Sequence, residues 1–245
     1  MVIVCNKEYS CLNTEYNMYF DKFKLNLSGF QKFAIKGIVE NSNVLITAHT
    51  GSGKTLPAEF AIDYFTSLGK KVIYTSPIKA LSNQKFHEFT IKFPNISIGI
   101  LTGDIKYNPD ADVLIMTTEI LCNTLFQNKI NKLNNSYEEI ISFKMDIENE
   151  LACVIFDEIH YINDKSRGKV WEETIMQLPK QVQMVMLSAT INHAKEFAEW
   201  IEKINPSKKT FLIETSHRVV PLFHYLYTYV PDSIVKKIKD AEIKG

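Results

Sequence analysis

The sequence predicts an α/β domain built on an open, doubly wound, mostly parallel sheet. Short β-branched apolar runs alternate along the chain with segments of helical periodicity, as in right-handed β-α-β units. The runs are apolar at successive positions, which is typical of strands buried on both faces of a parallel sheet. Six such runs are NVLIT (43–47), KVIYTS (71–76), SIGIL (97–101), DVLIMTT (112–118), LACVIFD (151–157) and QVQMVMLSAT (181–190).

Three segments between these runs have the spacing of amphipathic helices. LPAEFAIDYFTSLG (56–69) places its apolar residues on one face and ends in a glycine, a common helix stop. IKALSNQKFHEF (78–89) and NHAKEFAEWIEKI (192–204) repeat the pattern. Ligands of doubly wound sheets bind beyond the carboxyl ends of the strands, so the residues that follow each run are the candidates for function.

Composition indicates an ordinary globular protein of 245 residues, with 45% hydrophobic and 23% charged residues. Lys+Arg and Asp+Glu both number 28, so any nucleic-acid site must be local, not an effect of overall charge. The four cysteines form no C-x-x-C pair, which fits a reducing compartment. Without a signal peptide or an apolar stretch of ~20 residues, we expect no membrane partner and an intracellular protein in the cytoplasm or nucleus, or in a virion if the gene is viral.

Two regions depart from the alternation of strands and helices. We expect residues 1–22 to form an N-terminal extension outside the sheet. Residues from about 128 to 149, rich in Asn, Lys and Glu, are expected to form a surface insertion with one helix. Strand-like runs after residue 210 have no assignable partner. The expected domain therefore covers 23–215, and 216–245 is expected to lead away from it.

The run at 43–47 is followed by AHTGSGKT (48–55) and then by a helical segment. This is the phosphate-binding loop pattern in its strand–loop–helix context, with alanine at the first position, where glycine is usual. The glycines let successive N–H groups turn inward, and the helix N-terminus adds partial positive charge. The lysine is expected on the β- and γ-phosphates of ATP and the last hydroxyl on Mg²⁺. The alternative, a plain glycine-rich turn, is disfavoured because spacing and context both fit. The expected nucleotide-binding residues here are Thr50, Gly51, Ser52, Gly53, Lys54 and Thr55.

The run at 151–156 ends in two acids, and burying a bare carboxylate is costly unless something compensates its charge. A nucleotide-bound Mg²⁺ would do so: Asp157 is expected to bind it directly or through water, while Glu158 takes a proton from the attacking water. The alternative is a solvated helix cap. His160 lies two residues on, and a lone histidine is more often a structural hydrogen-bonding residue than a catalyst. The expected catalytic residues are Lys54, Asp157, Glu158 and His160.

Together these motifs resemble superfamily-two helicases of the DExH type. AHTGSGKT, SPIKALSNQK (76–85), LTGD (101–104), TTEIL (117–121), VIFDEIHYINDKSRGKVWEETIMQLP (154–179) and MLSATINHAKEFAEWI (186–201) are similar to the Ski/Mtr group, the RNA helicases that feed RNA to the exosome. The resemblance runs from about residue 23 to about residue 225. It implies a RecA-like P-loop NTPase fold, ATP-dependent RNA unwinding with ATP and Mg²⁺, single-stranded RNA held by its backbone, and an RNA-decay complex as partner.

The resemblance also implies a nucleic-acid grip made by the ends of three runs. Hydroxyls, backbone N–H groups and one lysine can hold phosphates without reading bases. The alternative for each segment is an ordinary loop or helix cap. The residues so implied are Ser76, Pro77, Lys79, Asn83, Gln84, Thr102, Gly103, Thr117, Thr118 and Glu119.

Two further roles follow from the resemblance. His160 would relay the nucleotide state to the segment Ser188, Ala189 and Thr190, which by itself is an ordinary N-cap pattern. In FKLNLSGFQ (23–31), Gln31 resembles the glutamine that reads adenine. Leu25 stands where an aromatic residue is expected, which leaves Phe23 as the stacking ring.

Helicases of this group carry a second RecA-like lobe with a Q-x-x-G-R-x-G-R segment, whose arginines reach the γ-phosphate. No such segment follows Thr190, and the arginines of the chain are Arg167 and Arg218. The sequence thus predicts the first lobe, which needs a second lobe in cis or in trans. Because such an arginine is worth ~10³–10⁵ in rate, we expect ATP binding with little turnover. Two alternatives remain: a stand-alone nucleotide-dependent RNA-binding module, and a lobe of a DNA helicase or translocase.

Overall fold

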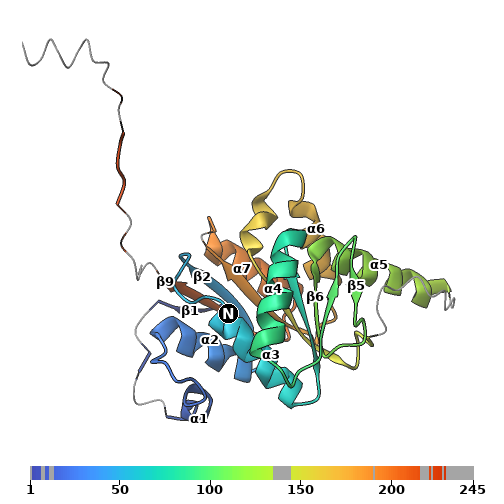
Figure 1. Ribbon diagram of the computed structural model, residues 1–245, viewed down its shortest axis with the longest axis horizontal. Helices are drawn as coiled ribbons and strands as arrows, with labels where there is room; N and C mark the ends of the chain where they lie inside the picture. The colour runs from blue at the N-terminus through green and yellow to red at the C-terminus, as the bar shows by residue number, and fades with distance from the viewer. Residues whose placement is uncertain are drawn as a thin grey trace, which may run out of the picture.

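The computed structural model describes residues 2–6, 9–10, 14–134, 145–189, 191–215, 221, 223–227 and 229. Within these ranges nine strands form one sheet in the order β1-β9-β2-β8-β7-β3-β6-β4-β5 (Figure 1). Neighbouring strands are parallel except β4 and β5, which pair antiparallel at one edge. The predicted doubly wound, mostly parallel sheet is confirmed. The strands are β1 (Ile3–Cys5), β2 (Asn43–Ala48), β3 (Lys71–Ser76), β4 (Ile98–Leu101), β5 (Lys106–Tyr107), β6 (Val113–Thr117), β7 (Leu151–Phe156), β8 (Gln183–Ser188) and β9 (Thr210–Thr215).

Helices cover both faces of the sheet (Figure 1). Those before β6 pack on one face and those after β6 on the other, each over its own apolar cluster. The strands supply both clusters: Val44 and Ile46 of β2 face the first, while Leu45 between them faces the second. This is why the runs are apolar at successive positions. The helices are α1 (Asn17–Phe20), α2 (Gly29–Val39), α3 (Leu56–Ser67), α4 (Lys79–Lys92), α5 (Thr118–Asn134), α6 (Gly168–Gln177) and α7 (Ala194–Ile204), with a 3₁₀ helix η1 (Ile159–Asn163) after β7.

The strand order places the candidate motifs together. β8 lies between β2 and β7, and β7 pairs on its other side with β3. The segments that follow these four strands therefore emerge side by side at the carboxyl edge of the sheet. They are the phosphate-binding loop, the end of the 181–190 run, the acidic pair and the start of SPIKALSNQK. Within the described ranges, no helix has the length and apolar character needed to cross a bilayer.

The expectation that residues 1–22 lie outside the sheet is wrong. β1 pairs in parallel with β9, with Ile3 opposite Phe211 and Cys5 opposite Ile213. Further along, the hydroxyl of Tyr16 donates to Glu40 at 2.6 Å and so ties this region to the end of α2. A strand of three residues is too short to show a period of two, and for that reason the sequence pattern did not reveal it.

The expected surface insertion over 128–149 is corrected in two respects. Its helix is the continuation of α5, which already begins at Thr118. The end of the region is not at the surface, because the side chains of Met145 and Ile147 are only 5% and 6% exposed and belong to the core beneath α5, α6 and α7. The intervening residues 135–144 lie outside the described ranges.

β9 is the partner that the sequence left unassigned after residue 210. It lies between β1 and β2, in register from Asn43 opposite Thr210 to Ala48 opposite Thr215. The expected domain limit at 215 coincides with the end of this strand. The domain limits themselves stay predictions, and the connection expected over 216–245 falls mostly outside the described residues.

Candidate active site

The loop after β2 has the backbone shape of an anion-binding nest. Gly51 and Gly53 adopt positive φ angles of 81° and 84°, which side chains with a Cβ rarely tolerate. Between them, Ser52 donates its N–H to the carbonyl of His49 at 3.2 Å. Its hydroxyl is buried and has no hydrogen-bond partner among the described residues. A buried polar atom without a partner inside a nest of N–H groups is consistent with a site shaped for an anion.

Lys54 and Glu158 meet at the mouth of this loop. The ammonium of Lys54 lies 2.9 Å and 3.0 Å from the two carboxylate oxygens of Glu158. Lys54 stands just before α3, whereas Glu158 follows β7 in a left-handed conformation with φ 51°. The structure therefore brings together the predicted phosphate-binding lysine and the predicted base, although a strand separates β2 from β7.

Asp157 is buried, and a tyrosine compensates its carboxylate. The hydroxyl of Tyr74 on β3 donates to Asp157 Oδ2 at 2.6 Å, and the N–H of Glu158 donates to Oδ1 at 3.0 Å. Burial raises the pKa of the Asp157 carboxyl above its usual value, although the Tyr74 hydrogen bond opposes the shift. Burial likewise raises the pKa of Tyr74, which keeps its hydroxyl protonated as a donor. Motif reasoning missed Tyr74, because a tyrosine within an apolar run is usually an ordinary core residue.

These groups also fit a magnesium ion held mainly by phosphates. No group of three or more His, Cys, Asp or Glu residues in the described part of the chain could hold a metal alone. Mg²⁺ in nucleotide sites usually takes one or two carboxylates together with phosphate oxygens and waters. One acid, Asp157, and the half-buried Thr55 at the start of α3 supply that kind of donor set.

Gln31 joins α2 to the phosphate-binding loop. Its side-chain carbonyl accepts the N–H of Ser28 at 2.9 Å, and its amide donates to the carbonyl of Gly53 at 3.1 Å. A Cβ at Gly53 would lie 2.8 Å from the same amide, so the glycine permits this contact. Phe23 packs beside Phe60 of α3, with ring centroids 6.3 Å apart. Gln31 thus contacts the loop directly and Phe23 packs on α3, but the adenine-reading role of Gln31 and Phe23 stays a prediction.

His160 lies beside Glu158, with Nδ1 3.3 Å from a carboxylate oxygen. Ser188 ends β8 opposite Thr47 of β2, and its buried hydroxyl has no partner among the described residues. Ala189 is half-buried, and Thr190 lies outside the described ranges. No hydrogen bond joins His160 to Ser188 in the part of the chain that the structure describes. The coupling role of the segment stays a prediction.

The candidate nucleic-acid residues divide into a buried and an exposed set. The buried ones serve the fold: Ser76 shares a 2.6 Å hydrogen bond with Ser82 of α4, and the hydroxyl of Thr102 accepts the N–H of Ile105 at 3.1 Å. The buried residues of this set could contact a nucleic-acid strand mainly through their backbone groups. The buried set is Ser76, Pro77, Thr102, Thr117 and Thr118, the exposed set is Lys79, Asn83, Gln84 and Gly103, and Glu119 is half-buried.

Lys79 is ion-paired within the exposed set. Its ammonium lies 2.6 Å from a carboxylate oxygen of Asp104, a residue that motif reasoning did not single out. A Cβ on Gly103 would lie 3.1 Å from that ammonium, so the glycine leaves room for the approach. α4 and the loop after β4 thus meet at this ion pair.

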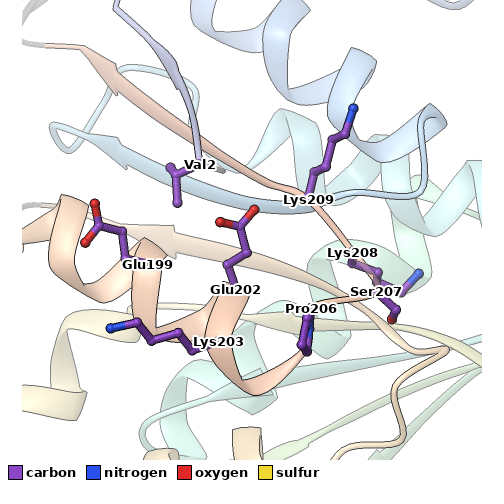
Figure 2. A pocket seen from close by; sticks show the side chains of 8 residues that line it. All are labelled: Val2, Glu199, Glu202, Lys203, Pro206, Ser207, Lys208 and Lys209. Atoms are coloured by element: carbon purple, nitrogen blue, oxygen red, sulfur yellow. The ribbon is translucent and has the colours of Figure 1, made fainter.

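A hollow of about 880 Å³ lies away from these residues. It opens where β1 and β9 begin, whereas the candidate site follows the carboxyl ends of the strands. Figure 2 shows charges of both signs around it, and Lys208 already donates to the carbonyl of Asn41 at 3.4 Å. None of the candidate site residues contributes to the hollow. Its lining residues are Val2, Glu199, Glu202, Lys203, Pro206, Ser207, Lys208 and Lys209.

Residues 28–197 match the DEAD/DEAH box helicase family, which is more than half of the chain. The chain belongs to the DEAD/DEAH box helicase family. Superkiller complex protein 2 of Mus musculus is 45% identical over 199 residues, which are 81% of this chain and 14% of that protein. ATP-dependent RNA helicase mtr4 of Schizosaccharomyces pombe is 44% identical over 212 residues, 86% of this chain and 17% of that protein. This helicase domain is thus homologous to ATP-dependent RNA helicases, and the expected resemblance to the Ski/Mtr group is confirmed. The chain spans less than a fifth of the length of either relative.

Solved helicase structures share the fold of this DEAD/DEAH box domain. Saccharomyces cerevisiae Dbp5 bound to RNA and ADP BeF3 superposes with a TM-score of 0.58 at 20% identity, over 82% of this chain and 48% of that one. The DUF1998 helicase MrfA bound to DNA gives 0.61 at 16% identity, over 85% and 30%. At these identities the likeness concerns the fold alone, and it confirms the RecA-like architecture.

Proposed function

We propose that this chain is the ATP-binding lobe of an ATP-dependent RNA helicase. The observation that carries the proposal is the ion pair between Lys54 and Glu158, 2.9 Å apart at the mouth of the phosphate-binding loop. A cation for the phosphates and a base for water must lie next to each other for phosphoryl transfer to water. The homology to RNA helicases supports the same assignment.

The residues of the chain have separate tasks in this proposal. Backbone N–H groups of residues 51–54 hold the β-phosphate, and Lys54 exchanges the Glu158 carboxylate for the γ-phosphate. Glu158 is thereby released to accept a proton from the attacking water. His160 Nδ1 lies 3.3 Å from the same carboxylate without a hydrogen bond to it among the described residues. Asp157 stays in place through its bond from Tyr74.

Mg²⁺ fits the donor set of Asp157 and Thr55, with phosphate oxygens as its other ligands. If bound there, Mg²⁺ would supply positive charge that stabilises the charge developing on the transferred phosphoryl group. A positive charge near the Asp157 carboxylate would favour its ionised form and oppose the effect of burial on its pKa.

RNA is the proposed nucleic acid, held by its backbone along the ends of β3, β4 and β6. The grip uses Lys79, Asn83, Gln84 and the backbone around residues 102–103 and 117–118, and it reads no base. Two relatives are named a Superkiller complex protein and an RNA helicase. On that basis we propose an RNA-decay complex as the partner, and a second RecA-like lobe, in cis or in trans, as the source of the missing arginines.

The test is ATP binding and ATP turnover by the 245-residue chain, with and without single-stranded RNA. We expect ATP binding that depends on Mg²⁺, and turnover that stays near background in both conditions. RNA-stimulated turnover would show that the chain completes its own site, for example by pairing with a second copy. Absence of ATP binding would contradict the proposal.

Competition between RNA and DNA oligonucleotides distinguishes the two nucleic acids. It must be run at one stated salt concentration, because phosphate contacts weaken steeply with salt. We expect RNA to compete more strongly than DNA of the same sequence. Equal competition would favour a DNA or dual-substrate translocase lobe. A stand-alone binding module is not favoured, because the relatives are helicases.

A further inference from the structure

Arg167 lies where two of the strand-end segments meet. Its Nη1 donates to the carbonyl of Pro77 at 3.5 Å, and Pro77 follows β3 directly. Its guanidinium lies over the ring of Tyr161, with Cζ 5.4 Å from the ring centroid. Tyr161 belongs to η1, the short helix that begins immediately after Glu158. One side chain therefore contacts both the acidic segment of the ATP site and the first residues of the candidate nucleic-acid grip.

The backbone around Arg167 is held in place. Its N–H donates to Asp164 Oδ1 at 3.0 Å, and the N–H of Ser166 donates to the same oxygen at 2.9 Å. The next residue, Gly168, packs so closely that a Cβ there would lie 2.1 Å from the carbonyl oxygen of Ile162. The Arg167 side chain thus extends from a backbone that hydrogen bonds hold in place, and its guanidinium packs over the Tyr161 ring. Such pre-organisation lowers the entropy that a side chain loses on binding.

The Arg167 guanidinium has N–H donors that no described residue accepts, whereas the nearby lysines are already paired with carboxylates. Lys54 is paired with Glu158, Lys79 with Asp104, and Lys85 with Glu88 at 2.7 Å. Among the residues that the structure describes, no carboxylate oxygen lies within 4.0 Å of the Arg167 guanidinium. A guanidinium has five N–H donors, and the bond to Pro77 uses one of them.

We propose that Arg167 is a further nucleic-acid-binding residue, whose guanidinium binds a backbone phosphate of the RNA beside Pro77 and Lys79. The inference rests on the proposed RNA-binding function and adds a residue from a fourth segment to its site. The planar guanidinium matches phosphate geometry with two parallel N–H donors, which a lysine cannot offer. A phosphate held there is also connected, through the Tyr161 ring, to the segment that carries Glu158.

The test measures binding of the 245-residue chain to a labelled 12-nucleotide oligouridine, by fluorescence anisotropy between 50 and 200 mM salt. Arg167→Gln is expected to weaken binding about 3–10-fold at the lowest salt, as for loss of one phosphate contact. The slope of log Kd against log salt should fall by about 0.7, the value for one phosphate of a single strand. Arg167→Lys should leave the salt slope unchanged and lose part of the RNA affinity. A lysine keeps the positive charge but lacks the pair of parallel N–H donors of the guanidinium.

Lys169→Gln is the matched control. It removes the same charge two residues away, from a side chain that is 82% exposed and lies 3.5 Å from Glu173. We expect it to change RNA affinity less than twofold and to leave the salt slope as it is. ATP affinity should be unchanged in both Gln variants, because neither residue reaches the phosphate-binding loop.

Three outcomes would overturn the inference. Arg167→Gln with the same RNA affinity and slope as the wild type would show that no phosphate lies at this position. A lower melting temperature and weaker ATP binding with an unchanged salt slope would show that Arg167 only holds η1 against the Pro77 turn. If the wild type does not bind oligouridine at 50 mM salt, the inference and the proposed RNA binding both fall.

Discussion

Lys54 and Glu158 form an ion pair across the mouth of the phosphate-binding loop, with Nζ 2.9 Å and 3.0 Å from the two carboxylate oxygens. The side chains are 10% and 26% exposed, so the pair is partly shielded from water. In the proposed function, the γ-phosphate of ATP takes the place of this carboxylate on the ammonium. ATP would then have to separate the pair on binding, and its affinity would contain the free energy of that separation.

Glu158→Gln is expected to bind ATP more tightly than the wild type and to lose any turnover. If the ion pair is worth roughly 1 kcal/mol, the affinity for ATP rises about fivefold. Turnover is lost because the amide cannot accept the proton of the attacking water. Calorimetry with ATP and Mg²⁺ and a phosphate-release assay give the two readouts, with the exposed Glu172→Gln as control. Turnover by the variant above background would place the base elsewhere, and weaker ATP binding would show that the pair does not compete with phosphate.

Lys54→Ala is expected to abolish ATP binding. The variant removes the ammonium that lies 2.9 Å from Glu158, and it leaves the acid beside the loop, where it would repel phosphate. Calorimetric titration with ATP and Mg²⁺ measures the loss. Lys195→Ala, at an exposed position of α7, is the charge-matched control and should bind as the wild type does. An ATP affinity within twofold of the wild type for Lys54→Ala would remove Lys54 from the site.

Asp157→Asn is expected to stabilise the fold near neutral pH. Burial raises the pKa of the Asp157 carboxyl in the folded state, so the folded protein binds its proton more tightly than the unfolded chain. Wild-type stability is thus highest at pH values where the carboxyl is protonated in both states, and it falls as pH rises through the raised folded-state pKa. The amide of the Asp157→Asn variant does not titrate, so the variant does not lose stability as the pH rises.

The gain in melting temperature of Asp157→Asn should therefore be largest at neutral pH and shrink as the pH falls towards the ordinary range of a carboxyl group. Thermal unfolding at a series of pH values measures it. Asp104→Asn, at a side chain that is 72% exposed, is the control without burial. A difference in melting temperature that does not change with pH would contradict the assignment of the raised pKa to Asp157.

Gly168→Ala is expected to destabilise the fold by about 1–3 kcal/mol or more, because overpacking forces the backbone to shift. The added Cβ would lie 2.1 Å from the carbonyl oxygen of Ile162. Gly29→Ala is a close control: Gly29 is also the first residue of its helix, and a Cβ there meets nothing nearer than 3.4 Å. Urea unfolding measures both variants. Equal stabilities would show that η1 and α6 can separate at little cost.

Asp104→Asn is expected to tighten RNA binding about two- to fivefold at low salt, since an exposed ion pair is worth up to ~1 kcal/mol. The ammonium of Lys79 lies 2.6 Å from the Asp104 carboxylate. In the variant, this carboxylate would no longer compete with an RNA phosphate for Lys79. The gain should vanish in the Lys79→Ala background, which oligonucleotide binding to the four proteins of the double-mutant cycle measures. A gain that persists without Lys79 would mean that Asp104 acts only by general repulsion.

The main elements of the sheet were predictable because burial on both faces leaves a plain signature. In β2, Leu45 faces one core cluster while Val44 and Ile46 face the other, so the run is apolar throughout. The phosphate-binding loop was predictable because its glycines must take positive φ angles, which limits the residues that fit. β1, with three residues, has no such signature.

The contacts of the site were less predictable, because they depend on strand order and register. Nothing in the sequence places β8 between β2 and β7, yet the distance from Lys54 to Glu158 depends on that order. Tyr74 looks like a core residue until the pairing of β3 with β7 brings its hydroxyl to Asp157. Asp104 and Arg167 belong to loops whose folding no periodicity describes.

The position of β9 has a consequence for the order in which the fold can form on the ribosome. β9 lies between β1 and β2, although it is the last of the described strands in chain order. Until residues 210–215 emerge, β2 has an open hydrogen-bonding edge and β1 has no partner within the sheet. At ~5–20 residues per second, that interval lasts on the order of ten seconds or more. The strand that carries the phosphate-binding loop therefore completes its hydrogen bonds on both edges only after residues 210–215 have been made.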